Sequence, residues 1–582
     1  MPKLKCQNCD LQAENLFKQD AIHFHKNLTK IAEGNILVCK YCEEQFKKNE
    51  EIRKNIVGSN SRHNLVIGGP GTGKTFLFKN IIENLPENSK ILVITYINNL
   101  VDDLKRQLDA ITDRKIEVQT LHSYCKGFLL RNIHPYIYFP DLPKIVEKDA
   151  SLLATEFNKE RLNHEIANLE RTGDNLHFYL SRAEYYDAAS HNDSVYRVYL
   201  FLKENSASIP NYSRIIIDEY QDFNPLEAGV IGLLSRDNAS IISGDDDQAL
   251  YRFKSASPEF IRDLYKDPRY DHHFLIYCRR CTMVLVKAAN ALIDYASKNK
   301  LLENRILKNY QCYWPDKFQD SRAYPKIVVS KCTTNKVSAK FIVKKILEIV
   351  KNENIQPSDK TEAEFIITAP SKIPSYLKEV NKILSDKNIL DPNIYEIEYK
   401  KESDKLSIDD GYELIKQDDK SNLGWRIVLY FDHIDPDEEI KIIQGTQTGK
   451  ALIELLPKDY ISKHKESAES FISKDKIKSE SESKKIKVKL TTYLGAKGLS
   501  ANHVFILGLE SKVFSSNPLS LKLDDICQFI VLLTRAKKSL SIVMSKIYDP
   551  RMHKSVNALP ALFSMIPIGY FAFGDKIKAS DL

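Results

Sequence analysis

The sequence contains no apolar run long enough to cross a membrane, and its first ten residues, MPKLKCQNCD, contain no apolar signal core. A membrane-spanning helix needs about 20 mostly apolar residues, and a secretory signal needs an apolar segment near the N-terminus. We therefore expect a cytoplasmic protein with no membrane partner. At 582 residues, 43% of them hydrophobic, the chain is long enough for several domains with separate cores.

The chain also has little net charge. Its formal charge is +7 and its isoelectric point is about 8.6. This mild positive excess permits a nucleic-acid partner without demonstrating one. Ten cysteines occur without a secretion signal, which favours reduced thiols or metal ligands over a disulfide framework. The pair Cys278 and Cys281 has no second pair nearby, and we interpret these two as incidental thiols.

Two closely spaced cysteine pairs open the chain, namely Cys6 with Cys9 and Cys39 with Cys42. Four thiolates can hold one zinc ion tetrahedrally and leave it no open position. The spacing therefore predicts a structural zinc module over residues 1–48, which could also dock a protein partner. An iron–sulfur cluster takes the same four ligands and stays open as an alternative.

A glycine-rich stretch, NLVIGGPGTGKT, begins at residue 64 and is followed by the amphipathic run FLFKNIIENL. This order predicts a strand, a glycine loop and a helix. Glycines let backbone N–H groups close on phosphate oxygens, and the helix N-terminus attracts the same anion. Lys74 would reach the β and γ phosphates, and Thr75 a magnesium ion. The predicted phosphate-binding residues are Gly68, Gly69, Pro70, Gly71, Thr72, Gly73, Lys74 and Thr75.

A second apolar run, residues 215–217, ends in Asp218 and Glu219 within RIIIDEYQDF. One carboxylate at such a strand end can hold magnesium through water. Its neighbour can orient or deprotonate the water that attacks the γ phosphate. Together with the upstream glycine loop, this pair predicts a nucleotide-hydrolysing site.

A third apolar run, from Ser240, leads into GDDDQALYRFK. The aromatic residues Tyr251 and Phe253 alternate there with Arg252 and Lys254. Aromatic rings beside cationic side chains suit base stacking next to phosphate contacts. A helix start with core aromatics is the alternative interpretation.

The alternation of strand-like and helix-like segments predicts an α/β protein with two α/β lobes and helical insertions, besides the zinc module. The expected parts are a first lobe over residues 49–125 and 205–270 with a helical insertion over 126–204, a second lobe over 271–385 and 486–548 with an insertion over 386–485, and a C-terminal tail over 549–582.

Eight segments occur in an order that resembles the UvrD/Rep-type superfamily 1 helicases. They are GGPGTGKT, YINN, TLHS, IDEYQD, GDDDQALYRF, CRRCT, TTYLGAKG and LLTRAKK. The resemblance covers most of residues 64–545. It implies that the two lobes are RecA-like P-loop lobes, that ATP, magnesium and single-stranded DNA are the ligands, and that movement is 3′ to 5′.

The resemblance also implies roles for individual residues. Asp218 would bind magnesium and Glu219 would activate water. Arginine fingers from the second lobe would stabilise charge in the transition state. The groups expected around the γ phosphate are Gln248, Arg280 and Arg535. The residues expected to contact single-stranded DNA are Thr95, Tyr96, Asn98, Thr120, His122, Tyr251, Phe253 and Thr492.

The chain departs from the family pattern around the nucleotide base and sugar. No glutamine stands at the family's usual distance before the glycine loop, because Gln45 lies too far upstream. Arg279 replaces the tyrosine that would stack on adenine, and a planar guanidinium can still stack. Leu494 and Ser500 replace a histidine and an acidic residue. ATP remains the expected nucleotide, with relaxed base specificity open.

The sequence thus predicts an ATP-dependent helicase or translocase on single-stranded DNA, with RNA as an open alternative track because stacking and phosphate contacts do not select the sugar. A second hypothesis keeps the ATPase but makes it a nucleic-acid-activated switch or sensor that signals to a partner. A third makes the chain the motor subunit of a nuclease complex, whose cleavage would need another chain.

Overall fold

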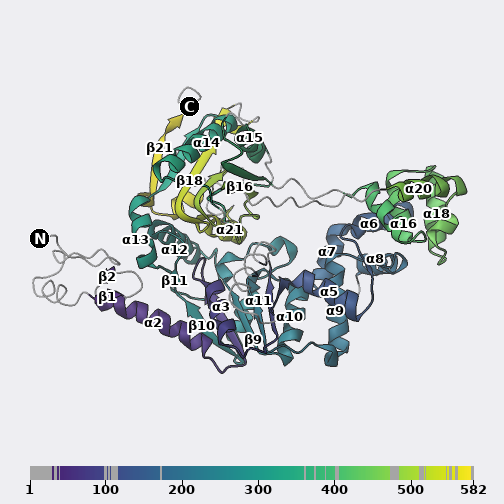
Figure 1. Cartoon of the computed structure of the whole chain (residues 1–582), viewed down its shortest axis with the longest axis horizontal. Coiled ribbons are helices and arrows are strands. Elements are labelled where there is room, and N and C mark those ends of the chain that lie inside the picture. The colour runs from purple at the N-terminus through teal and green to yellow at the C-terminus, as the bar shows by residue number, and fades with distance from the viewer. Residues whose placement is uncertain are drawn as a thin grey trace, which may run out of the picture.

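The chain was analysed as a computed structural model. The structure describes residues 29–31, 36–38, 40–96, 101, 105, 116–170, 173–358, 362–371, 375–386, 389–399, 406–471, 484–509, 517, 520–545, 547–549, 554–556 and 561–578. Two parallel sheets dominate these residues, one in the lower and one in the upper part of Figure 1. The predicted α/β class is confirmed.

The first lobe is built on six parallel strands in the order β10-β3-β9-β8-β4-β5. The strands are β3 (His63–Gly68), β4 (Ile91–Thr95), β5 (Ile116–Thr120), β8 (Arg214–Ile217), β9 (Ser240–Gly244) and β10 (Tyr270–Leu275). Leu65 and Ile67 face one core and Val66 the other. Side chains alternate across a strand, so an apolar run that is buried on both faces belongs in a sheet covered on both sides.

Helices cover both faces of this sheet. The helices of the first lobe are α2 (Lys40–Val57), α3 (Lys74–Asn84), α10 (Pro225–Asp237) and α11 (Glu259–Lys266). The core on the Val66 side takes Leu77 and Ile81 from α3 and Ile56 from α2. This packing holds the N-terminal end of α3 at the carboxyl edge of the sheet, where β3 ends.

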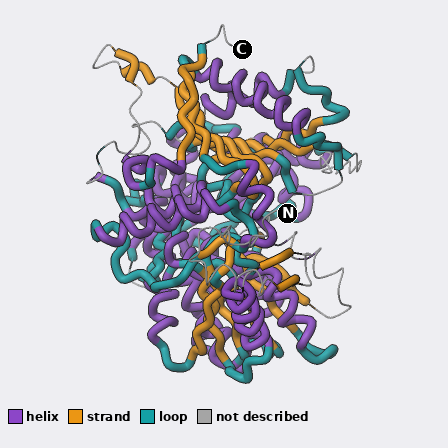
Figure 2. The backbone as a smooth tube through the Cα atoms, turned by 90° about the vertical axis from the view of Figure 1, so that its left-hand side faces the viewer, coloured by secondary structure: helices purple, strands orange, loops and turns teal. Residues whose placement is uncertain are grey.

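The second lobe has seven parallel strands in the order β15-β16-β14-β17-β18-β13-β21. They are β13 (Ile327–Cys332), β14 (Phe365–Ala369), β15 (Tyr395–Tyr399), β16 (Ile486–Thr492), β17 (Ala501–Leu507), β18 (Ala536–Ser545) and β21 (Phe571–Ile577). Its helices are α12 (Met283–Lys298), α13 (Trp314–Ala323), α14 (Asn335–Asn352), α15 (Ser375–Leu384) and α21 (Leu523–Leu533). Figure 2 shows the two sheets as separate groups of strands with helices between them.

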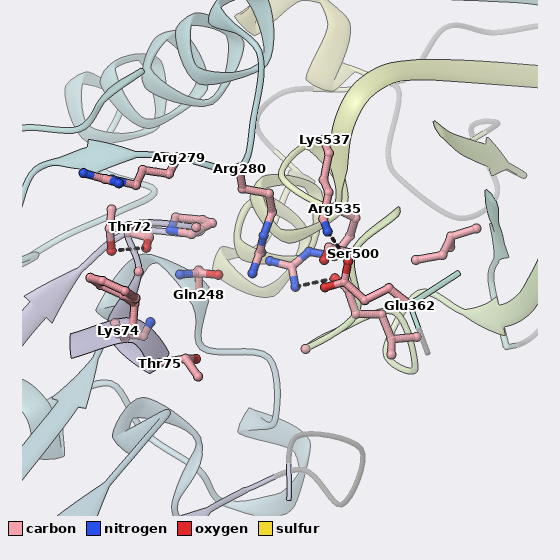
Figure 3. Close-up of a pocket in the computed structure, with 18 of the residues that line it drawn as sticks. Thr72, Lys74, Thr75, Gln248, Arg279, Arg280, Glu362, Ser500, Arg535 and Lys537 are labelled. Carbon is pink, nitrogen blue, oxygen red and sulfur yellow. Dashed lines mark hydrogen bonds and ion pairs between the residues drawn. The ribbon is translucent and has the colours of Figure 1, made fainter. Parts of the chain in front are cut away.

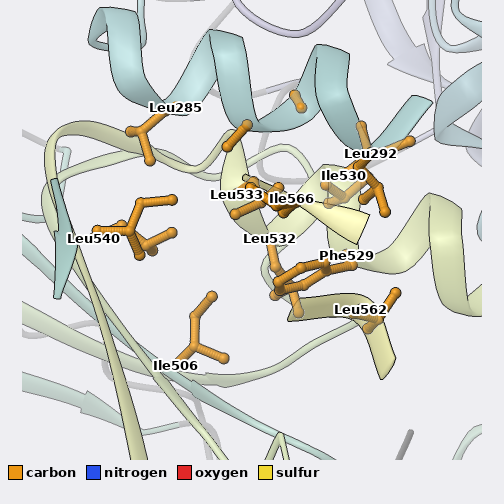
Figure 4. Packing of buried hydrophobic residues seen from close by; sticks show 14 of the residues in the cluster. Leu285, Leu292, Ile506, Phe529, Ile530, Leu532, Leu533, Leu540, Leu562 and Ile566 are labelled. Carbon is orange, nitrogen blue, oxygen red and sulfur yellow. The ribbon is translucent and has the colours of Figure 1, made fainter. Parts of the chain in front are cut away.

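One hydrophobic core packs α12 and α21 against the second sheet (Figure 4). Leu285 and Leu292 of α12 pack in it with Ile530 and Leu533 of α21, and all four side chains are fully or almost fully buried. Each buried leucine or isoleucine contributes roughly 1.5–3 kcal/mol of transfer free energy. The segments on either side of α12 are therefore anchored to the second lobe.

Each lobe carries a helical insertion. That of the first lobe comprises α5 (Leu121–Asn132), α6 (Leu142–Leu152), α7 (Lys159–Ala167), α8 (Asp174–Tyr185) and α9 (His191–Glu204), with the short strands β6 (Ile137–Tyr138) and β7 (Ala188–Ala189). That of the second lobe comprises α16 (Ile408–Gln417), α17 (Asn422–Phe431), α18 (Pro436–Thr446), α19 (Leu452–Leu455) and α20 (Lys458–Ser470). Figure 1 places the second insertion beside α6 and α8 of the first.

Buried ion pairs join the two insertions. Asp149 of α6 accepts hydrogen bonds from Arg182 of α8 at 2.9 Å and from Arg426 of α17 at 2.7 Å. Arg182 also donates to Thr446 of α18 at 2.8 Å. Asp149 and Arg426 are fully buried. Removing one partner from such a pair costs about 3–5 kcal/mol because the other charge is left buried and unpaired, so the packing of the second insertion on the first depends on both partners.

The described sheets correct three of the expected boundaries. β10 pairs with β3, so the first lobe continues past residue 270 instead of ending there. β15 pairs with β16 and belongs to the second sheet, although it falls within the expected insertion of residues 386–485. β21 pairs with β13, so the expected tail of residues 549–582 contains an edge strand of the second lobe. A short apolar run shows where a strand occurs but not which strand it joins.

Smaller elements complete the described residues. β1 (Thr29–Ile31) pairs antiparallel with β2 (Ile36–Val38), and β19 (Ile547–Asp549) pairs antiparallel with β20 (Lys554–Val556). β11 (Tyr277–Cys278) pairs with β12 (Gln311–Cys312). Among the described helices, none combines the length and the apolar character that a membrane crossing requires.

Candidate nucleotide site and nucleic-acid interface

The glycine loop connects β3 to α3 at the carboxyl edge of the first sheet. Gly71 and Gly73 have φ angles of +70° and +82°, which favour glycine because a Cβ would be strained there. The loop leads directly into the N-terminus of α3 at Lys74, a position that favours an anion. Lys74 Nζ donates to Gly68 O at 3.3 Å, and Arg53 Nη2 of α2 donates to Thr72 O at 2.8 Å.

The two carboxylates stand at the end of β8, next to the loop. Glu219 Oε1 lies 3.9 Å from Lys74 Nζ, and both side chains are almost buried. Asp218 Oδ1 accepts a hydrogen bond from Ser243 at 2.5 Å, and Gln221 donates to Glu219 at 2.6 Å. Glu219 has a φ of +55°, a strained conformation for a residue with a side chain. This backbone directs its carboxylate toward Lys74.

Electrostatics separate the two carboxylates. Burial would raise the pKa of Glu219, but Lys74 and Lys497 outweigh burial and lower it to about 2. Burial and the neighbouring Glu219 raise the pKa of Asp218. Glu219 is thus a fixed anion near neutral pH. Asp218 lies in a buried, anion-rich position that a cation would stabilise.

The residues that could hold magnesium are Asp218 and Thr75. Both line the cleft described below. A carboxylate and a hydroxyl are oxygen donors of the kind that Mg²⁺ prefers. The raised pKa of Asp218 fits a site that is completed by a cation.

The cleft lies between the lobes and has a volume of about 580 Å³. The first lobe contributes the glycine loop, both carboxylates and Gln248, and the second lobe contributes Arg280 and Arg535. In Figure 3 the two arginine side chains reach into the same space as Gln248. The glycine loop from Gly69 onward, both carboxylates, Gln248 and the two arginines therefore line one cavity, whereas Gly68 does not line it and its carbonyl accepts a hydrogen bond from Lys74.

Arg535 is held rigidly in that cleft. It donates to Val531 O at 2.9 Å and to Leu499 O at 3.2 Å, and its side chain is almost fully buried. Burial and the neighbouring Arg280 lower its pKa to about 10. Arg535 is buried and Arg280 is half-buried, and their two positive charges repel each other, so this pocket favours an anion between or beside them.

Arg279 and Phe76 also line the cleft. The Arg279 guanidinium lies 4.2 Å from the centre of the Tyr313 ring, and the Arg279 N–H donates to Gly71 O at 2.9 Å. Phe76 is 50% exposed. The predicted stacking of Arg279 on a base stays a prediction, and the ring beneath it fixes the plane of its guanidinium.

Five of the predicted DNA-binding residues lie at or next to the edge of the first sheet. Thr95 ends β4 and Thr120 ends β5, and the two are register partners. The Tyr96 ring lies 4.8 Å from that of Tyr251, and the Tyr251 ring lies 6.1 Å from that of Phe253. Phe253 is 64% exposed. The three aromatic residues thus form a row that ends at an open ring.

The other predicted contacts are placed differently. His122, in the first turn of α5, stacks on His191 with ring centres 4.0 Å apart, and burial together with His191 lowers its pKa to about 3. It is therefore neutral near pH 7. Thr492 ends β16 in the second lobe, and its hydroxyl accepts from Gly495 N at 3.1 Å. Asn98 lies outside the described residues.

The predicted zinc ligands are not placed by the structure. Cys6, Cys9 and Cys39 lie outside the described residues, and of Cys42 only the backbone, in the first turn of α2, is described. Cys278 and Cys281 are buried beside the glycine loop, and Cys281 N donates to Cys278 Sγ at 3.3 Å.

The structure adds a residue that the sequence did not single out. Lys497 of the second lobe donates to Gln248 O at 2.7 Å and forms an ion pair with Asp222. Its Nζ also lies 5.6 Å from the centre of the Tyr251 ring. Lys497 thus connects the cleft to the aromatic row across the lobe interface. Its place in YLGAKG marked a motif, but no sequence signal shows the distant carbonyl it contacts.

Comparisons with known proteins agree with this arrangement. A family profile described as "AAA domain" matches residues 53–254, which include the glycine loop and both carboxylates. The chain is similar to a probable DNA helicase II homolog of Mycoplasma genitalium, with 23% identity over 84% of each chain. It is also similar to the probable DNA helicase II homolog of Mycoplasma capricolum, with 23% identity over 49% of this chain and 44% of that protein.

A further relative is the ATP-dependent DNA helicase Rep of Buchnera aphidicola, with 25% identity over 38% of this chain and 36% of that protein. The chain thus spans less than half of two of these relatives and most of the third.

Proposed function

We propose that the chain is an ATP-hydrolysing DNA helicase that moves along single-stranded DNA, in the 3′ to 5′ direction. The observation that carries this proposal is the interlobe cleft. It brings Lys74 and Glu219 of the first lobe together with Arg280 and Arg535 of the second. The names of the relatives support ATP as the nucleotide and DNA as the track.

The site supplies each function that phosphoryl transfer needs. The glycine loop and Lys74 bind the β and γ phosphates. Asp218 and Thr75 would hold Mg²⁺, which neutralises charge on the phosphate oxygens when bound. Glu219 is ionised near neutral pH because its pKa is about 2, so its carboxylate can orient the attacking water by accepting a hydrogen bond from it. Arg280 and Arg535 stabilise the charge that develops in the transition state.

Movement along DNA would follow because the two lobes share the nucleotide cleft. The γ phosphate attracts the two arginines only while it remains attached, so hydrolysis releases one lobe from the other. Lys497 contacts both the Gln248 backbone and the Tyr251 ring. Closure of the cleft therefore shifts the surface on which bases would stack.

The test is a turnover assay on the purified chain with single-stranded DNA, duplex DNA and RNA as separate activators. We expect magnesium-dependent hydrolysis of ATP that single-stranded DNA stimulates most. Turnover that no nucleic acid changes would contradict the proposal, and equal stimulation by RNA would contradict the choice of track.

A second candidate is a nucleic-acid-activated ATPase that signals to a partner without processive unwinding. The docking of α17 and α18 on α6 and α8 favours it, since the Asp149 and Arg426 pair ties an insertion of the second lobe to the first. This contact joins the two lobes at a place away from the nucleotide cleft. Stepwise movement on a fluorescent single strand would support the helicase, and stimulated hydrolysis without movement would support the switch.

Replacing Phe253 with alanine should weaken binding to single-stranded DNA by about 1–3 kcal/mol, the contribution of one stacked base. The residue ends the aromatic row and is 64% exposed, so its removal should leave the fold and basal hydrolysis intact. Fluorescence anisotropy with a labelled oligonucleotide measures the change. Leu307→Ala is the control, because Leu307 is 79% exposed and carries no aromatic ring. Equal affinity of Phe253→Ala and wild type for the oligonucleotide would show that Phe253 is not part of the DNA interface.

For the four cysteines Cys6, Cys9, Cys39 and Cys42 we propose one structural zinc ion and a module that docks a protein partner. Metal analysis of the purified chain should return about one zinc per chain, as a closed four-thiolate site requires. Cys125→Ser, at a buried cysteine of the first lobe, should keep the zinc, and Cys9→Ser should lose it. Iron with visible absorbance would indicate an iron–sulfur cluster instead of zinc. A protein without metal would contradict both the zinc site and the cluster.

A further inference from the structure

Residues 301–310, here called the clasp, connect α12 to β12 and lie against the first lobe although they emerge from the second. Ile306 is buried in the core of the first lobe, and its N–H donates to Asp246 at 2.8 Å. The Tyr310 hydroxyl donates to Pro70 O at 2.8 Å, in the glycine loop. The clasp thus contacts both the glycine loop and the aspartate run that precedes Gln248.

Lys308 of the clasp stands among three buried carboxylates. Its Nζ lies 2.6 Å from Asp245, 2.8 Å from Asp246 and 2.7 Å from Asp247, and its side chain is only 6% exposed. One oxygen of each aspartate lies within 4.8 Å of the others. The ammonium group therefore takes the place that a metal ion would take in a similar cluster of carboxylates.

Charge balance makes this ammonium important. Burial would lower the pKa of Lys308, but the three aspartates outweigh burial and raise it well above its usual value. Lys308 is therefore charged at every physiological pH. Arg262 also pairs with Asp246 and Arg305 with Asp247, so loss of the ammonium would act chiefly on Asp245, which Lys308 contacts at 2.6 Å.

One of the three carboxylates, that of Asp245, contacts a residue that lines the cleft. Asp245 accepts a hydrogen bond from the Gln248 side chain at 2.6 Å and another from Asp247 N at 3.2 Å. The amide of Gln248 is thus held by Asp245, which is held by Lys308. Gln248 lines the cleft, where it faces the space between the lobes.

We propose that Lys308 is a positioning residue for ATP hydrolysis, a fixed cation of the second lobe that sets the side chain of Gln248 through Asp245. This inference rests on the proposed ATPase function. Lys308 does not line the 580 Å³ cleft and acts only through the aspartate. The second lobe would therefore reach the γ-phosphate site by two routes, the arginines directly and Lys308 indirectly.

Lys308→Met keeps the length of the side chain and removes its charge. We expect kcat to fall about 10- to 100-fold, as when a charge-assisted hydrogen bond is lost, with KM for ATP nearly unchanged because the glycine loop and Tyr310 are intact. Arg305→Met is the matched control. Arg305 belongs to the clasp and is similarly buried, but its hydrogen bonds go to Asp247, at 3.0 and 2.6 Å. An equal loss in the two variants would overturn the role of Asp245, and so would full activity of Lys308→Met.

A second variant separates positioning from general stability. A cavity of about 50 Å³ borders Lys308 and Asp245, and Lys308→Ala would enlarge it enough to admit a small amine. Propylammonium should restore turnover in Lys308→Ala, because it returns an ammonium with N–H donors to the aspartates. Tetramethylammonium at the same ionic strength should not, because it has no N–H group. Restoration by neither ion, or by both equally, would contradict the inference.

A measurement without turnover distinguishes this inference from the proposed function. Amide hydrogen exchange of residues 244–251 should be faster in Lys308→Met than in wild type, while exchange in β4 stays unchanged. If wild type hydrolysed no ATP, the proposed function would fail, but the exchange result would still decide whether Lys308 holds the Gln248 segment. Unchanged exchange there would overturn the inference even in an active enzyme.

Discussion

Glu219→Gln should lower ATP turnover by about 10²- to 10⁴-fold, the usual contribution of general acid–base catalysis, while nucleotide binding persists. The carboxylate lies 3.9 Å from Lys74 Nζ. The positive charges of Lys74 and Lys497 lower its pKa to about 2. A glutamine keeps the size and the hydrogen bond with Gln221 but cannot accept a proton. Single-turnover hydrolysis and equilibrium binding of a fluorescent ATP analogue measure the two effects separately.

The control for this variant is Glu184→Gln, which makes the same chemical change at a 58% exposed side chain of the first insertion. It should hydrolyse ATP as wild type does. Because the pKa of Glu219 is far below neutral, protonation of this group should not reduce wild-type turnover between pH 6 and pH 8. Near-normal turnover of Glu219→Gln, or loss of nucleotide binding in it, would contradict the assigned role.

Local patterns predicted the first-lobe side of the cleft because each of its parts is contiguous in sequence, whereas Arg280 and Arg535 were expected only from the family resemblance. The glycine loop lies between the buried β3 and the amphipathic α3, and the two carboxylates follow the three isoleucines of β8. In a parallel sheet the carboxyl ends of the strands share one edge. Knowing only that β3 and β8 are parallel neighbours of β9 is therefore enough to bring Lys74 and Glu219 together. The sequence supplied both strands and their polar ends.

Pairings over long distances could not be predicted in the same way. β21 joins the second sheet beside β13, more than 200 residues earlier in the chain. Its sequence, FAFGDKI, alternates weakly and contains a glycine and two charges. An edge strand buries less than a central one, so its apolar signal is weaker. The order of the motifs along the chain carries no information about such edges.

The same limit applies to Lys308 and Lys497. Each is one of 85 lysines and arginines, and nothing in its neighbours distinguishes a buried cation from a solvated one. What makes them functional candidates is the position of their partners on the other lobe, Asp245 for one and the Gln248 carbonyl for the other. Lobe interfaces are thus where sequence patterns are least informative. They are also where coupling between hydrolysis and movement must occur.

Arg280→Ala and Arg535→Ala should each lower turnover by about 10³- to 10⁵-fold, the contribution typical of an arginine finger. Both side chains line the cleft from the second lobe, and the first lobe with its glycine loop does not depend on them for folding. Binding of a fluorescent ATP analogue should fall far less than turnover. Arg269→Ala is the control, because Arg269 is 76% exposed and pairs only locally, with Asp267 at 2.6 Å.

The contrast with Phe253→Ala tests the whole scheme, because the two kinds of variant remove different steps. The arginine variants should lose hydrolysis both with and without single-stranded DNA, since they act on the transition state itself. Phe253→Ala should keep basal hydrolysis and need more DNA for stimulation, since it removes only a stacking surface. Titrating DNA against turnover in each variant measures this difference. Full basal activity of the arginine variants, or loss of basal hydrolysis in Phe253→Ala, would mean that the cleft and the aromatic row are not coupled as proposed.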